Sequence, residues 1–101
     1  MEENTKTYLK DKIKKQIEHA KEEIKKSDEE IKLLEADLEV EKKMLGMLDI
    51  DAHLDKDDKE SAKFGIEAAE GELFQEKEKN DNLKKNLKFF EYKLKVLESQ
   101  F

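Results

Sequence analysis

The sequence predicts an all-α protein: an antiparallel two-helix coiled-coil hairpin that dimerises into a four-helix bundle. Three observations lead to this prediction. Two long runs of apolar residues have heptad spacing, the 101 residues include no Pro and only three Gly, and five Asp cluster between the runs. With 48% charged residues the chain has too few apolar residues for a spherical core. Its regular apolar spacing argues against disorder, the other reading of such polarity.

The first helix is expected over about residues 4–48. Its apolar residues recur at steps of four and three, the spacing of heptad positions a and d, which together form the seam between two helices. Polar Ser27 and Glu41 interrupt this seam. Its members are Ile13, Ile17, Ala20, Ile24, Ser27, Ile31, Leu34, Leu38, Glu41, Leu45 and Leu48.

Residues 49–58 break the spacing and are expected to form an acidic turn. The turn resembles a calcium loop in the placement of its weak candidate ligands Asp49, Asp51, Asp55, Asp57 and Glu60. However, His53 replaces an oxygen ligand, and Leu54 stands where such a loop needs Gly. We therefore expect no metal site and a turn that caps the second helix. A calcium-responsive hairpin is the lesser alternative.

The second helix is expected over about residues 59–100. Its seam is Ala62, Ile66, Ala69, Leu73, Glu76, Asn80, Leu83, Leu87, Phe90, Leu94, Leu97 and Phe101. A turn centred near residues 53–54 pairs seam residues whose numbers sum to about 107. This register sets Ser27 opposite Asn80, with Glu76 one layer away beside Ile31. We expect Ser27, Glu76 and Asn80 to form a polar layer that fixes the register at some cost in stability.

Charge and motifs exclude several function classes. All 21 basic residues are Lys and the net charge is −6, which argues against direct nucleic-acid binding. The chain has no Cys, two His distant in sequence, and no phosphate-loop or hydrolase motif, so we expect neither an enzyme nor a cofactor. The chain contains no long apolar segment, so we expect neither a membrane span nor a signal peptide. A cytoplasmic protein is the default expectation.

Apolar residues outside the seam indicate a partner-binding face. With Ile17 and Leu87 at position a, most of these residues occupy positions c and g, which share one flank of each helix. This c/g surface is expected to be larger than the scattered apolar surface of a monomer, and so to bind a protein. The predicted residues are Leu9, Leu33, Val40, Met44, Met47, Phe89, Tyr92 and Val96.

The predicted function is therefore a non-enzymatic protein–protein interaction module: an adaptor, chaperone or inhibitor. Self-association as a homodimer is the commonest use of such a surface. The alternative function is an acidic decoy that occupies a basic nucleic-acid-binding site on a target protein. This alternative comes from the acidic middle of the chain, since residues 27–43, 49–60 and 67–78 each have a net charge of about −4 by count.

Overall fold

The computed structural model describes residues 1–50 and 56–101, and the side chains of 1–48 and 56–101. Helix α1 spans Glu3–Ile50 and helix α2 spans Lys56–Gln100, and the described residues contain no strand. The predicted all-α helical hairpin is confirmed. Helix α2 begins three residues earlier than expected. Asp57 and Asp58, expected in the turn, lie in its first turn, where carboxylates interact favourably with the helix dipole.

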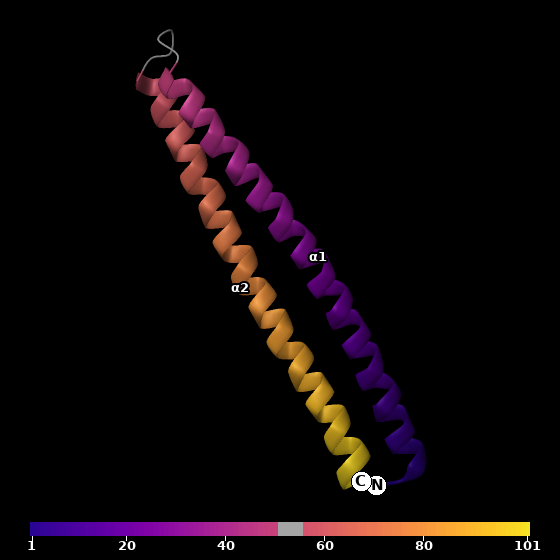
Figure 1. The fold of residues 1–101 in the computed structure, drawn as a ribbon. Coiled ribbons are helices and arrows are strands. Elements are labelled where there is room, and N and C mark those ends of the chain that lie inside the picture. Colours follow the sequence, from indigo (N-terminus) through magenta and orange to yellow (C-terminus); the bar gives the residue numbers. More distant parts are fainter. Residues whose placement is uncertain (51–55) are drawn as a thin grey trace. The chain divides into compact units, whose positions relative to one another are not determined.

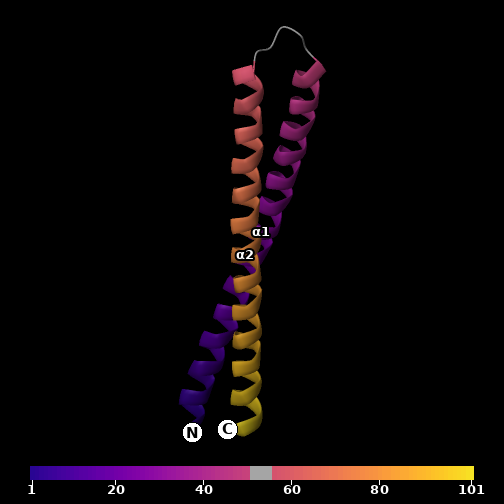
Figure 2. The ribbon, with the colours of Figure 1, turned by 90° about the vertical axis from the view of Figure 1, so that its left-hand side faces the viewer.

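The chain forms two compact units. Unit 1 consists of Met1–Asp28 and Lys79–Phe101, and unit 2 consists of Glu29–Glu78. In unit 1 the first turns of α1 lie beside the last turns of α2, so that the two termini are neighbours (Figures 1 and 2). Each unit therefore contains one segment of each helix, and the two segments run antiparallel.

The core of each unit follows the predicted seam. Unit 1 buries Ile13, Ala20 and Leu97, and unit 2 buries Ala62, Ala69 and Leu73. All other predicted seam positions of the described residues are buried or half-buried, apart from Phe101. The prediction is wrong there, since Phe101 follows the last residue of α2 and its side chain is 61% exposed. No single large side chain dominates either core, which is typical of a thin two-helix interface.

In unit 2 a polar seam residue of α1 lies beside a glycine of α2. A Cβ at Gly65 would lie 3.5 Å from Oε1 of Glu41, an ordinary van der Waals contact, so the two helices are close neighbours at this point. Oε2 of Glu41 is buried and has no hydrogen-bond partner among the described residues. The predicted register pairs Glu41 with Ile66, one residue from the observed neighbour Gly65. Glu41 therefore interrupts the apolar core of unit 2 without forming a polar pair there.

Candidate interaction surface

Two members of the polar layer predicted in the seam, Ser27 and Asn80, lie in the core of unit 1, whereas the third, Glu76, belongs to unit 2 and is half-buried. Ser27 is 2% exposed and Asn80 is 3% exposed. Nδ2 of Asn80 donates a hydrogen bond of 2.8 Å to Oδ1 of Asp28, the residue after the partner expected for Asn80. The hydroxyl of Ser27 is buried and has no partner among the described residues. The layer thus consists of one satisfied contact between the helices and one unsatisfied hydroxyl, and its role in setting the register stays a prediction.

Ser27→Ala is expected to stabilise the protein. The substitution removes a buried hydroxyl that forms no hydrogen bond and adds a residue of higher helix propensity, which together predict about 1–2 kcal/mol more free energy of unfolding. Urea denaturation followed by circular dichroism measures the change. The matched control is Ser99→Ala, since Ser99 is exposed and its hydroxyl donates to the carbonyl of Lys95 in the same helix. A loss of stability in Ser27→Ala would contradict the account of an unsatisfied hydroxyl.

Ion pairs join the two helices within each unit. In unit 2 Lys42 pairs with Glu70 at 3.9 Å, and Lys77 pairs with Glu35 at 3.6 Å. All four residues occupy heptad position e. In unit 1 Lys10, at heptad position a, pairs with Glu98, at position e, at a distance of 3.4 Å. These side chains are partly exposed, so each pair contributes little stability, but the two pairs of unit 2 distinguish its e flank from the opposite one.

The opposite flank of unit 2 exposes the aliphatic part of the predicted face. Four side chains of α1 at positions c and g are exposed there, and Met47 is the most exposed at 72%. The two ion pairs of unit 2 described above lie at position e and leave this flank open. The exposed side chains are Leu33, Val40, Met44 and Met47.

Unit 1 exposes the aromatic part of the predicted face. Phe89 is 73% exposed and Tyr92 is 68% exposed. They lie three residues apart on α2 and line a shallow surface depression together with Lys85 and Lys88. An aromatic surface bordered by ammonium groups can bind an apolar partner that has acidic residues nearby.

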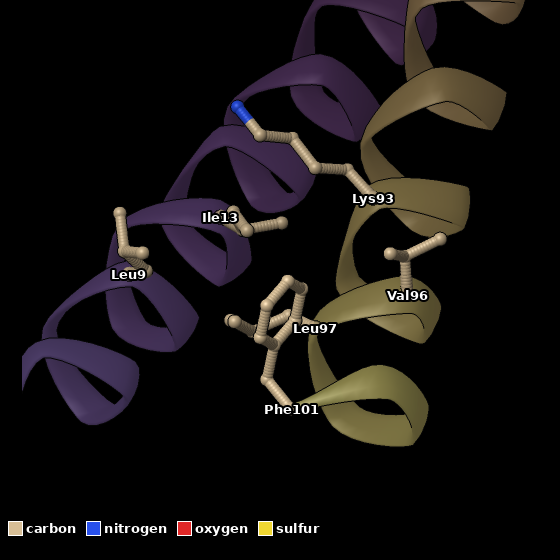
Figure 3. Close-up of a pocket in the computed structure, with 6 residues that line it drawn as sticks. All are labelled: Leu9, Ile13, Lys93, Val96, Leu97 and Phe101. Atoms are coloured by element: carbon tan, nitrogen blue, oxygen red, sulfur yellow. The ribbon is translucent and has the colours of Figure 1, made fainter. Parts of the chain in front are cut away.

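Leu9 and Val96 differ from the prediction because both are half-buried. They line a groove of about 160 Å³ in unit 1. Figure 3 shows that Leu9 and Ile13 come from α1, whereas Lys93, Val96 and Leu97 come from α2. The ring of Phe101, which follows α2, lies beside Leu97, and the side chain of Lys93 extends toward α1. The terminal aromatic residue, which the sequence placed in the seam, instead forms part of this groove.

Three other aromatic side chains are exposed outside the predicted face. Phe64 and Phe74 lie in unit 2, and Phe64 borders a depression that includes the acidic residues Asp57 and Glu60. Tyr8 is exposed in unit 1 and was not predicted as part of the face. The sequence could have indicated its exposure, because Tyr8 is an aromatic residue at a heptad position outside the seam.

The weak candidate metal ligands lie in and beside the acidic turn. Asp51, His53, Leu54 and Asp55 lie outside the described residues, and so does the side chain of Asp49. Asp57 and Glu60 belong to the start of α2. Within the described part of the chain, no three His, Cys, Asp or Glu side chains are grouped as metal ligands would be. The same residues contain no helix long and apolar enough to cross a membrane.

Comparisons of the chain with protein-family models, with curated proteins and with solved structures found no match.

Proposed function

We propose that the protein is a non-enzymatic protein–protein interaction module that docks through exposed apolar side chains of its helical hairpin. The observation that supports this proposal most strongly is the exposure of Leu33, Val40, Met44 and Met47 on the flank of unit 2 opposite its ion pairs. Unit 1 adds the exposed aromatic side chains of Phe89 and Tyr92. Scattered single apolar residues are normal on a surface, whereas a series at regular heptad spacing is a binding feature.

The two units offer different chemistry to a partner. Unit 2 offers the aliphatic and methionine side chains Val40, Met44 and Met47, and flexible thioethers adapt to irregular apolar surfaces. Unit 1 offers Phe89 and Tyr92, aromatic residues of the kind that dominate binding energy in protein interfaces. A partner helix or a second copy of the chain fits these surfaces, and an adaptor, a chaperone or an inhibitor in the cytoplasm uses such docking without any chemical reaction.

The experiment that tests this function is the introduction of a carboxylate into either surface. Phe89→Glu in unit 1 and Val40→Glu in unit 2 leave the cores unchanged, since both side chains are exposed. Loss of association with retained helicity supports the function. Association equal to that of the parent in both variants contradicts it.

The alternative function, an acidic decoy, is favoured by the charge of unit 2. This unit contains 7 Lys and 17 Asp or Glu, a net charge of −10. A decoy binds a basic nucleic-acid-binding site through exposed charges, which salt screens within about 10 Å at 0.1 M. Its complex with a basic target is therefore expected to weaken strongly between low and moderate salt. A complex that is insensitive to salt excludes the decoy and favours apolar docking.

A further inference from the structure

We infer that the groove of unit 1 binds an acidic peptide segment of another protein, which inserts one large apolar side chain and places a carboxylate at Lys93. This site is additional to the surfaces of the proposed function. Shape, charge and an unpaired ammonium group support the inference. The residues that line the groove all belong to unit 1: Leu9, Ile13, Lys93, Val96, Leu97 and Phe101.

The groove has the size and lining of a site for a single apolar side chain. Its volume is about 160 Å³, close to that of an apolar cavity of about 150 Å³ that binds one benzene molecule. Ile13 and Leu97 are buried and lie at its base, while Leu9 and Val96 are half-buried beside them. Aliphatic groups thus border a depression that fits a leucine or phenylalanine side chain of a partner.

The two ends of the groove differ in chemistry. In Figure 3 the side chain of Lys93 extends from α2 toward α1 at one end, whereas the ring of Phe101 lies beside Leu97 at the other. Lys93 is exposed, and it forms no ion pair with any described residue. Lys10, by contrast, pairs with Glu98 at 3.4 Å. The ammonium group of Lys93 is therefore available to a carboxylate of the partner.

The positive charge of unit 1 is concentrated in the segments that supply the groove. Residues 1–15 and 84–101 contain 10 Lys and 5 Asp or Glu, a net charge of +5. The rest of unit 1, residues 16–28 and 79–83, contains 4 Lys and 5 Asp or Glu, a net charge of −1. A surface of this kind attracts an acidic segment and disfavours a basic one. The charge therefore identifies the partner segment as acidic.

The shape of the groove favours a peptide over an anionic membrane. Surfaces that bind membranes insert protruding apolar side chains into the lipid. Here Leu9 and Val96 are half-buried and border a depression, which receives a side chain from the partner instead. A segment with acidic residues around one leucine or phenylalanine has the complementary shape and charge.

Titration of the ¹⁵N-labelled protein with synthetic peptides, followed by NMR, tests the inference. The acidic peptide has one phenylalanine flanked by glutamates, and the matched basic peptide has lysine in place of each glutamate. Vesicles containing phosphatidylserine are titrated in parallel. The variants are Lys93→Glu and Phe101→Ala, whose parent side chains are exposed so that neither substitution disturbs a core. Lys84→Glu is the control, because Lys84 is exposed on the same helix as Lys93 but does not line the groove.

The acidic peptide is expected to shift the amide signals of the groove residues, and the basic peptide is expected to leave them unchanged. Lys93→Glu should raise the dissociation constant about fivefold or more, because it removes an ion pair and adds a like charge. Phe101→Ala should raise it about threefold or more, because apolar contact is lost. Lys84→Glu should bind the peptide nearly as the parent does.

Absence of binding, or equal binding of the two peptides, overturns the inference. Equal weakening by Lys93→Glu and Lys84→Glu also overturns it, since net charge would then act without the groove. Binding of the vesicles in place of the acidic peptide overturns the peptide segment as the partner. The proposed function fails separately, if Phe89→Glu and Val40→Glu both associate as the parent does.

Discussion

Phe89→Glu is expected to convert the associated protein into a monomer of 11.9 kDa. The substitution replaces an aromatic ring that is 73% exposed in the single chain with a carboxylate that must lose its water when the partner docks. Truncation of a central aromatic residue in an interface costs 2 kcal/mol or more, so the dissociation constant is expected to rise about 30-fold or more. Val40→Glu is expected to act in the same direction, because Val40 lies on the other docking surface.

Helicity separates this effect from unfolding. Neither Phe89 nor Val40 lies in a core, so the far-ultraviolet circular dichroism of both variants should stay close to that of the parent. Phe74→Glu is the matched control, since the same substitution is made at an exposed phenylalanine outside the c/g surface. Light scattering during gel filtration gives the masses. Equal dissociation in Phe74→Glu would indicate a general effect of added charge and would contradict a specific role for Phe89.

Leu73→Ala is expected to cost about 2–4 kcal/mol of the free energy of unfolding. Leu73 is 8% exposed and is the largest of the three buried side chains of unit 2, so its truncation loses apolar burial and leaves a cavity in a thin core. Urea denaturation at fixed protein concentration measures the loss. The free energy of unfolding of a two-helix hairpin is small, so the variant should unfold at a much lower urea concentration than the parent.

The neighbouring substitution Phe74→Ala provides the comparison for this core prediction. Phe74 follows Leu73 directly but is 64% exposed, so its truncation should change stability by less than about 0.5 kcal/mol. Similar losses at the two positions would contradict the assignment of Leu73 to the seam. They would indicate that unit 2 buries a different face of α2.

Much of the fold could be predicted because heptad spacing specifies both the helices and their buried faces. The steps of four and three from Ile13 to Leu48 identified residues that the structure buries or half-buries throughout the described seam. Spacing is less informative at chain ends, where Phe101 lies beyond α2 and packs at a groove instead. The predicted start of α2 also differs from the observed one, because Asp is compatible with both a turn and the first turn of a helix.

The details of side-chain pairing could not be predicted as fully. Asn80 was expected beside Ser27, yet its amide donates to Asp28, because a carboxylate one residue away is a stronger acceptor than a hydroxyl. The ion pairs on the e flank were not predicted, although opposite charges at position e of both helices would have indicated them. Leu9 and Val96 are half-buried and line one groove with Phe101, an arrangement that periodicity does not describe.

The central claim is that the exposed apolar side chains of the helical hairpin bind a second copy of the chain, the commonest use of such a surface. Light scattering coupled to gel filtration of the untagged protein, at several concentrations, tests it most directly. The account predicts a mass of about 24 kDa, twice the 11.9 kDa of one chain, with dissociation only on dilution. A mass near 12 kDa at every concentration would contradict it.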